Sequence, residues 1–457
     1  MRPIHIISVG LAYGATPSLA SSLEHRTSSV ADTNLLDTLS SAANDQGEWD
    51  QGERNALSNL VSQLQQVGSI FTPNTPNEAL SDLQHSYGLK GYSNIVDIAW
   101  DITAAGLIPP EILSFLNGYT DSELNSLDNQ NPAPEDDIYP KSSEDAPYSL
   151  SEETLRSAIH IPETFGHGRN GKIPVVLIPG TAIPSGTTWY YSFSKLGDST
   201  DADVVWVNLP RASLNDAQVS AEYVAYAINY ISSLCGKPVA LISWSQGGLN
   251  TQWALKYWPS TRPALQDFIA MSPDFHGTIV EAAICPALTY IACTPSILQQ
   301  AWESNFITTL RSDDGDSAYV PTTVIYSSFD EIVEPMSGPD ASALLGDMRN
   351  VGVTLAHIQT VCADQPGGTF YTHEGVLYNP LAWALAIDAI THDGPANISR
   401  LNLGQVCGMI LAPELDLLDL FGTEGLLLVA AAELVSYKPQ AAREPPIAGY
   451  ASHGGGA

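Results

Sequence analysis

A short apolar run that ends at a serine flanked by small residues constrains the fold of this chain most. Residues 238–242 (PVALI) are apolar and have the length of a buried strand, and residues 248–255 (GLNTQWAL) are helix-like. Between them lies SWSQG at 243–247, where small residues stand two positions before and two positions after Ser245. Such residues let a strand turn sharply into a helix and lift the serine hydroxyl above the sheet edge. The segment predicts a nucleophile elbow, although Ser243 replaces the first glycine of the usual G-x-S-x-G pattern.

Apolar segments of strand length alternate with helix-length segments from Lys172 onward, interrupted by an excursion at 277–311. The predicted strands cover 174–178, 204–207, 238–242, 268–271, 323–326 and 353–359, and the predicted helices cover 215–234, the stretch from Ser245 to about 257, and 375–391. Continuous apolar strands separated by helices of this length are typical of a mostly parallel sheet with helices on both faces. The predicted fold class is α/β.

The remainder of the chain divides by composition. Residues 1–20 carry one positive charge, a short apolar stretch and a small-residue site, which is the pattern of a secretory signal peptide, with an ordinary flexible N-terminus as the alternative. Residues 21–145 predict a helical extension, a possible pro-region, with helices at about 57–67, 76–87 and 110–117 and an acidic, proline-rich linker at 129–147. We expect a catalytic domain over 146–440 and a flexible tail over 441–457.

The charge balance bears on partners. The 50 acidic residues exceed the 18 basic ones, and the resulting net charge of −32 repels phosphate backbones and anionic lipid headgroups. We therefore expect no nucleic-acid partner. The apolar run from Leu415 to Val435 contains four carboxylates, which favours a buried or interfacial helix over about 413–435 and argues against a membrane span. We expect a secreted monomer that makes at most transient contact with a lipid–water interface.

Five cysteines suit two disulfides and one spare thiol in an extracellular protein. Cys285 and Cys293 are close enough to staple a local excursion, and Cys362 with Cys407 would close a longer loop, which leaves Cys235 as a buried free thiol. No metal-ligand spacing is present, and we expect neither a metal nor a cofactor. One sequon, Asn397-Ile398-Ser399, is compatible with glycosylation.

A nucleophilic serine needs a base, and the base needs an acid that fixes its tautomer. After an elbow of this kind the chain order is serine, then acid, then histidine. Asp330 directly follows the predicted strand 323–326 and is the predicted acid, with Glu331 as the alternative. His373 is the predicted base because it lies in a loop after the last strand and before the final helix. The other histidines after Asp330 lie in a strand pattern, at a helix end and in the glycine-rich tail: His357, His392 and His453.

The oxyanion hole of such a site uses the backbone N–H of the residue after the nucleophile and a donor from the loop after the first strand. Gln246 is the first of these residues. The second is predicted to be Thr181, which ends the sequence Pro179-Gly180-Thr181 after the strand 174–178 and offers both an N–H and a hydroxyl.

Several spaced segments resemble the secreted fungal lipases of the Candida antarctica lipase B type: IPGT at 178–181, SWSQGGL at 243–249, SPDFHGT at 272–278, PTT at 321–323 and DEIV at 330–333. The resemblance covers about 146–436. It implies the α/β-hydrolase fold, hydrolysis of carboxylic esters including triacylglycerols, and the same triad and oxyanion residues. It further implies pocket roles for four residues: Trp244, Asp274, Gln300 and Ile332.

The chain also departs from that family. Only the disulfide that matches Cys362–Cys407 is kept, whereas Cys285 and Cys293 fall in a segment that flanks the mouth of the site. That segment, 279–293, predicts either a lid or a core helix. Ile183 replaces a small, flexible residue after the oxyanion threonine, and we expect it to narrow the pocket.

The predicted activity is ester hydrolysis by acyl transfer to Ser245. Two alternatives remain at this stage. The same triad would serve an esterase for short-chain or polyester substrates, and a hydrolase fold can act as a non-catalytic binding protein.

Overall fold

The computed structural model describes residues 72–89, 99, 102–103, 105–117, 119, 122–199, 201–280 and 293–452. The predicted signal peptide at 1–20, the predicted helix at 57–67, Cys285 with most of the 279–293 segment, and His453 lie outside these residues.

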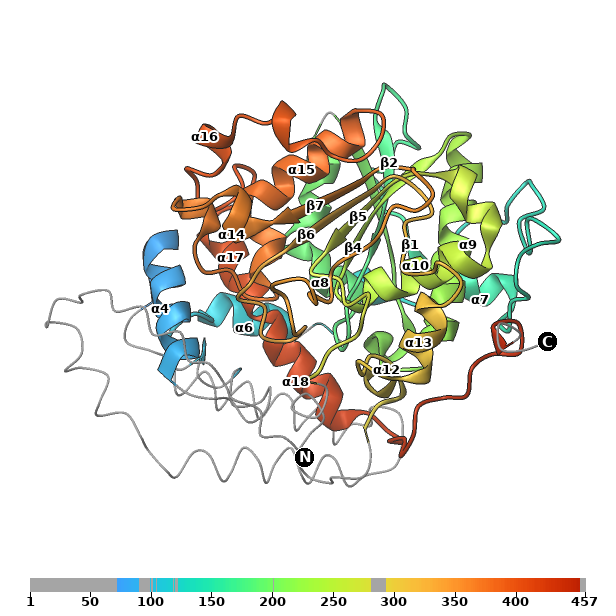
Figure 1. Cartoon of the computed structure of the whole chain (residues 1–457), viewed down its shortest axis with the longest axis horizontal. Helices are drawn as coiled ribbons and strands as arrows, with labels where there is room; N and C mark the ends of the chain where they lie inside the picture. The colour runs from blue at the N-terminus through green and yellow to red at the C-terminus, as the bar shows by residue number, and fades with distance from the viewer. Residues whose placement is uncertain are drawn as a thin grey trace, which may run out of the picture.

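A seven-stranded sheet forms the centre of the molecule, in the order β1-β3-β2-β4-β5-β6-β7 (Figure 1). Its strands are β1 Ile159–His160, β2 Ile173–Ile178, β3 Ala202–Val207, β4 Val239–Trp244, β5 Leu265–Met271, β6 Thr322–Tyr326 and β7 Val353–His357. Every neighbouring pair is parallel except β1 with β3. The sequence predicted every strand except β1, which has only two residues and therefore no readable alternation.

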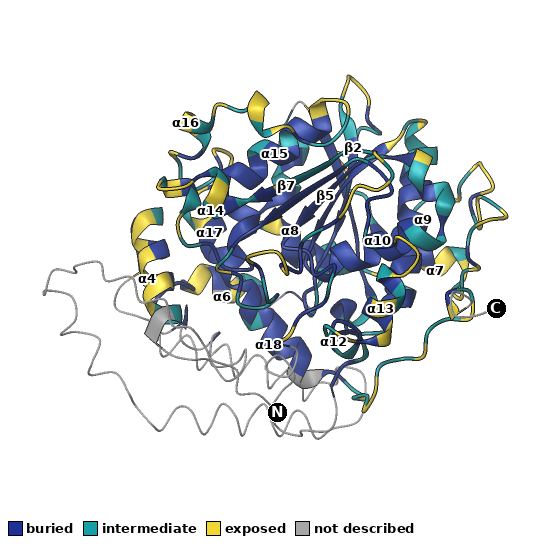
Figure 2. Ribbon diagram, in the orientation of Figure 1, coloured by how far each residue is buried: buried dark blue, intermediate teal, exposed yellow. Residues whose placement is uncertain are grey.

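Helices cover both faces of the sheet, as predicted, and buried residues fill the space between the sheet and the helices on each face (Figure 2). The α-helices are α4 Pro76–Leu89, α6 Pro110–Asn117, α7 Glu152–Ser157, α8 Ser185–Tyr190, α9 Ala217–Cys235, α10 Gln246–Tyr257, α12 Pro295–Gln299, α13 Asn305–Arg311, α14 Ile358–Val361, α15 Pro380–Thr391, α16 Leu403–Val406, α17 Leu417–Glu424 and α18 Leu426–Ser436.

Alternate residues of each strand serve the two faces because successive side chains of a strand point in opposite directions. On β2, Val175 and Leu177 join a core with α4, α6, α8, α15, α17 and α18. Val176 and Ile178 join a second core with α7, α9, α10 and α13. All four side chains are fully buried, which explains why the strand is apolar throughout.

The predicted helix at 413–435 is two helices. Asp416 and Asp419 form a capping box at the start of α17, so two of the carboxylates that interrupt the apolar run satisfy backbone N–H groups of the first turn. Gly425 ends α17 and precedes α18. Within the described residues, no helix is long and apolar enough to cross a membrane. The predicted helix at 375–391 also divides, because Pro380 and its cap Asn379 start a new helix, α15, after a 3₁₀ turn at Gly375–Tyr378.

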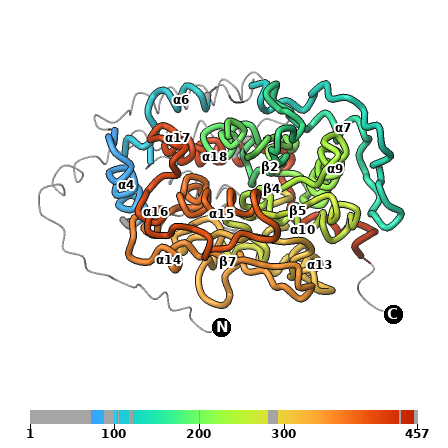
Figure 3. Tube along the Cα trace, turned by 90° about the horizontal axis from the view of Figure 1, so that it is seen from above, coloured from blue at the N-terminus to red at the C-terminus, as the bar shows by residue number. Residues whose placement is uncertain are grey.

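The described part of the N-terminal region shares the core of the hydrolase fold. Leu83 of α4 and Ile112 of α6 are fully buried in the same cluster as Leu420 of α17. Figure 3 shows α4 and α6 beside α17. The predicted linker lies along α9, where Tyr230 donates a hydrogen bond to the Pro132 carbonyl at 2.7 Å. The described residues between 72 and 147 therefore pack into one structure with the sheet and its helices.

The C-terminal segment differs from its prediction as a flexible tail. The Gln218 side chain of α9 bonds Pro446 O at 3.1 Å and Ala448 N at 2.7 Å. Tyr450 packs on Trp258 and accepts a hydrogen bond from the indole of Trp253 at 3.1 Å. Residues 446–451 are thus held on the α9 and α10 layer by aromatic packing that composition alone did not indicate.

Candidate functional site

Ser245 occupies the sharp turn between β4 and α10. Its backbone has φ 55° and ψ −131°, a conformation that non-glycine residues rarely adopt and that is typical of functional sites. Gly247 allows the turn, because a Cβ atom there would lie 2.7 Å from the carbonyl oxygens of both Ile178 and Pro179. Ser243 is fully buried at the end of β4, beside Ile178 of β2, so a small residue fits without a glycine. The elbow geometry predicted from the sequence is present.

His373 and Asp330 form a buried pair. The ring Nδ1 of His373 lies 2.7 Å from Asp330 Oδ2, and the two side chains are 3% and 0% exposed. The other carboxylate oxygen of Asp330 accepts the backbone N–H groups of Ile332 at 3.1 Å and Val333 at 2.8 Å. These contacts orient the carboxylate, and the pair leaves Nε2 of the histidine available to a substrate or nucleophile.

The alternative acid, Glu331, faces a different part of the same histidine. Its Oε2 atom accepts the backbone N–H of His373 at 3.1 Å, whereas the ring faces Asp330. Burial and the nearby Asp330 raise the pKa of Glu331. Asp330 is thus the only one of the two that can fix the ring tautomer in this arrangement.

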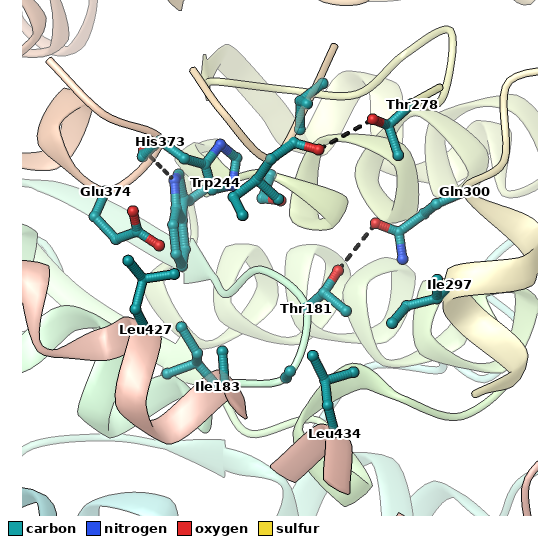
Figure 4. Close-up of a pocket in the computed structure, with 15 residues that line it drawn as sticks. Thr181, Ile183, Trp244, Thr278, Ile297, Gln300, His373, Glu374, Leu427 and Leu434 are labelled. Carbon is teal, nitrogen blue, oxygen red and sulfur yellow. Dashed lines mark hydrogen bonds between the residues drawn. The ribbon is translucent and has the colours of Figure 1, made fainter. Parts of the chain in front are cut away.

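Ser245 and His373 line one cavity together with Thr181 and Trp244 (Figure 4). No hydrogen bond joins Ser245 Oγ to the His373 ring between these two described residues, and such contacts are often long before substrate binds. Trp244 contacts His373 twice, because its indole N–H donates to the His373 carbonyl at 3.1 Å and the two ring centroids lie 4.9 Å apart.

A small polar network surrounds Thr181. Its hydroxyl lies 2.8 Å from Gln246 Oε1 and 3.0 Å from Gln300 Oε1. The next residue, Ala182, has φ 63°, and its N–H donates to the Ala212 carbonyl at 2.7 Å. Three successive residues, 211–213, also have positive φ. The loop after β2 is therefore held in a strained conformation, which is the kind of rigid backbone that an oxyanion site needs.

The rest of the cavity wall is apolar. Ile183 and Ile332, both predicted as pocket residues, line it. The remaining apolar wall comes from Ala182, Ile297, Val333, Leu427, Ala430 and Leu434. The last three lie on α18, within the apolar segment 413–435 predicted from the sequence, and their spacing of i, i+3 and i+7 is that of a one-sided apolar face.

The cavity is small. Its volume is about 40 Å³, whereas ligand pockets commonly measure several hundred Å³. Ile183 is 1% exposed and lines this wall, and that it narrows the pocket stays a prediction.

Two residues that the sequence placed at the site do not line the cavity. Gln246, predicted to donate its backbone N–H, directly follows Ser245, and its side chain contacts Thr181 and Gln300. Asp274 is fully buried and does not line it either. Burial raises the pKa of Asp274 to about 7, and its two carboxyl oxygens have no hydrogen-bond partner among the described residues.

The other titratable candidates are structural. His357 bonds Ser328 and Thr360 at the end of β7, and His392 contacts Asp388 at the end of α15. Among the described residues, no group of His, Cys, Asp and Glu has the geometry of a metal site.

The cysteines follow their predicted arrangement where the structure describes both partners. Cys362 and Cys407 form a disulfide. Cys235 is free and half-buried, less enclosed than expected. The Cys285–Cys293 pairing stays a prediction, because Cys285 lies outside the described residues.

The parallel sheet, the strained serine after β4 and the buried histidine–aspartate pair define an α/β-hydrolase. No family model matches the chain. Lipase B of Pseudozyma antarctica is 30% identical over 283 residues, which are 61% of this chain and 79% of that protein. The crystal structure of Aspergillus fumigatus lipase B is 56% identical, has a TM-score of 0.84, and covers 91% of this chain and 99% of its own. The chain belongs to the family of fungal lipases represented by these two proteins, and it is a carboxylic ester hydrolase.

The Aspergillus structure also bears on the N-terminal region. A match over 91% of this chain extends well in front of residue 146, so most of the predicted extension has a counterpart there. The resemblance visible in the sequence begins only at about residue 146 and gave no counterpart for this region.

Proposed function

We propose that this protein is a lipase that cleaves carboxylic esters, including triacylglycerols, through a Ser245–His373–Asp330 triad and an acyl-enzyme intermediate. The observation that carries the proposal is that His373, which lines the same cavity as Ser245, has its Nδ1 2.7 Å from Oδ2 of the buried Asp330. Family membership supports the same reaction class.

His373 Nε2 takes the proton of the Ser245 hydroxyl while Oγ attacks the ester carbonyl. The negative oxygen of the tetrahedral intermediate lies against the backbone N–H of Gln246 and the donors of Thr181. The Thr181 hydroxyl carries one hydrogen, so it must turn away from Gln246 or Gln300 when it donates to that oxygen.

The imidazolium formed in this step is stabilised by the Asp330 carboxylate and gives its proton to the leaving alcohol. Water then enters, loses a proton to His373 and attacks the acyl-enzyme, which frees the carboxylic acid and restores Ser245. All of these residues lie within 146–440, the segment proposed as the catalytic domain.

The apolar wall supports an apolar substrate. Side chains of α18 and α12 face the cavity, where they would contact hydrocarbon and gain the usual hydrophobic stabilisation. The narrowness of the cavity favours a second candidate, an esterase for short-chain esters. Rates on short-chain esters and on emulsions of long-chain triacylglycerols, measured with one preparation, separate the two.

Secretion is part of the proposal. Its support is the signal-like N-terminus, the Cys362–Cys407 disulfide and the exposed position of Asn397 in the sequon. The proposed enzyme works as a monomer without a cofactor.

The nucleophile is tested with Ser245→Ala and with a fluorophosphonate that labels activated serines. We expect the wild-type protein to be labelled at Ser245, and we expect Ser245→Ala to lose both label and activity. Ser452→Ala, which removes a hydroxyl bonded only to Gly449 O at the surface, should behave as the wild type. Undiminished ester hydrolysis by Ser245→Ala would contradict the proposal, and an unlabelled wild type would favour the non-catalytic alternative.

A further inference from the structure

Three glutamates lie next to the proposed base and acid, of which Glu374 and Glu424 are buried and Glu331 is half-buried. Glu331 directly follows Asp330, Glu374 directly follows His373, and Glu424 ends α17. Burial is the main cause that raises the pKa values of all three: Glu331, Glu374 and Glu424. Neighbouring carboxylates raise the pKa values of Glu331 and Glu374 further. We call these three residues the glutamate cluster. The proposed mechanism assigns none of them a role.

Hydrogen bonds link the glutamate cluster to the backbone on both sides of the base. Glu331 accepts the N–H of His373 itself. Glu424 accepts the hydroxyl of Thr372 at 2.8 Å and that of Tyr378 at 2.7 Å. Thr372 in turn accepts the N–H of Gly375 at 2.8 Å. The loop that carries His373 is therefore anchored through carboxyl groups rather than through regular secondary structure.

One contact to this cluster comes from a distant part of the chain. The hydroxyl of Tyr87, near the end of α4, donates to Glu331 Oε1 at 3.2 Å, across 244 positions of sequence. The Tyr87 ring packs against Phe370, which precedes His373 by three residues, with centroids 5.8 Å apart. Burial and the carboxylates of all three cluster glutamates raise the pKa of this hydroxyl well above its usual value, so it stays a hydrogen-bond donor at every working pH.

The described N-terminal residues reach the catalytic loop without obstructing the site. Thr181, Trp244 and α18 line the cavity, whereas no described residue before 181 does so. A pro-region that blocked the site by its described helices would have to line it. The contact made by Tyr87 of α4 reaches the backbone of His373, through Glu331, and not the ring that faces the cavity.

We propose that Tyr87 is a positioning residue of the catalytic centre: its hydroxyl orients Glu331, Glu331 holds the backbone of His373, and the N-terminal region thereby completes the working site. The inference rests on the proposed role of His373 as the base. A base that must accept the Ser245 proton within hydrogen-bond reach is sensitive to small displacements of its backbone.

The glutamate cluster gives this contact a pH-dependent signature. An ionised Glu331 accepts the His373 N–H and the Tyr87 hydroxyl more strongly than a neutral one, because charge-assisted hydrogen bonds are stronger. The described ionisable groups that face Glu331 are Asp330, His373, Glu374, Glu424 and Tyr87. Loss of the Tyr87 donor removes stabilisation from the carboxylate, so Glu331 should ionise at higher pH.

Tyr87→Phe tests the inference, because it removes only the hydroxyl and keeps the ring against Phe370. We expect kcat on a soluble ester to fall by about two- to tenfold, the range that the loss of one hydrogen bond implies, with little change in KM. We also expect the increase of kcat that accompanies ionisation of Glu331 to occur at higher pH. Tyr190→Phe is the matched control, since Tyr190 is a surface tyrosine that also stacks on a phenylalanine, Phe115, and does not line the cavity.

Glu331→Gln completes a double-mutant cycle. If Tyr87 acts through Glu331, the double variant loses no more activity than Glu331→Gln alone, and both lack the part of the rise of kcat with pH that comes from ionisation of Glu331, while the part that comes from His373 remains. Titration of each preparation with the fluorophosphonate counts competent sites, so kcat per labelled site does not depend on how much of a variant folds.

The outcomes are distinct. Wild-type kcat and pH profile in Tyr87→Phe, or a lowered melting temperature with unchanged kcat per site, would overturn the inference while leaving the proposed function intact. Additive losses in the cycle would also overturn it. A wild-type protein that the phosphonate does not label would instead refute the proposed function.

Discussion

Replacing Asp330 by Asn is the most informative perturbation of the proposed triad, because it removes a charge and keeps the shape. Asp330 is fully enclosed, and its Oδ1 accepts two backbone N–H groups. An asparagine oxygen can keep those two bonds. Its NH₂ group then faces His373 Nδ1, which must become the acceptor, so the ring hydrogen moves to Nε2. The base is then in the tautomer that cannot take a proton from Ser245.

The magnitude follows from the geometry of the pair. The closest nitrogen and oxygen atoms are 2.7 Å apart, and the two charges are spread over each group, so their centres are about 4 Å apart. At an effective dielectric constant of about 20, opposite charges at that separation attract by about 4 kcal/mol. This attraction develops only when His373 becomes cationic during the reaction. Its loss corresponds to a fall in kcat of about a thousandfold, to which the wrong tautomer adds.

The assay measures kcat per active site on a soluble chromogenic ester. Active sites are counted by labelling with a phosphonate, and the incubation is long because the variant should react slowly. Asp340→Asn removes one negative charge from an exposed position and is the control for net charge. A melting temperature close to that of the wild type establishes that the variant is folded. A loss of less than tenfold in folded Asp330→Asn would refute the reasoning, because the carboxylate would then not stabilise the transition state.

Three further predictions concern the elbow, the core and the disulfide. Gly247→Ala should abolish esterase activity and lower the melting temperature, because its Cβ would meet two backbone carbonyls at 2.7 Å, whereas Gly449→Ala has open space and should have no effect. Burial raises the pKa of Asp267 to about 8. Between about pH 4 and pH 8 the folded state therefore binds more protons than the unfolded state, and stability falls as pH rises. Asp267→Asn removes this cost and should raise the melting temperature more at pH 8 than at pH 5. Replacing Cys362 and Cys407 by serine should lower the free energy of unfolding by about 4 kcal/mol in the chain-entropy model, given their separation of 45 residues, and a denaturant titration that shows a loss below about 1 kcal/mol would contradict that model here.

Short stretches of sequence were sufficient to predict those features that depend on neighbouring residues alone. The elbow was predictable because a strained turn demands small residues at fixed offsets from Ser245, and the parallel strands were predictable because both of their faces are buried. The acid was narrowed to two adjacent residues by its place after β6. Neighbours in sequence have nearly the same position, however, so only the side-chain directions in three dimensions distinguish Asp330, which meets the His373 ring, from Glu331, which meets its backbone.

The sequence by itself determined the fold class and the family and supplied the proposal of Ser245 and His373, since each depends on periodicity, spacing or short motifs. Tertiary structure decided the rest. It showed that Asp274 does not line the cavity, which residues of α18 do, and that Tyr87 contacts Glu331 across 244 positions. Such contacts depend on how separate apolar faces pack together, and packing of elements that are distant in the chain leaves no pattern in any one segment of it.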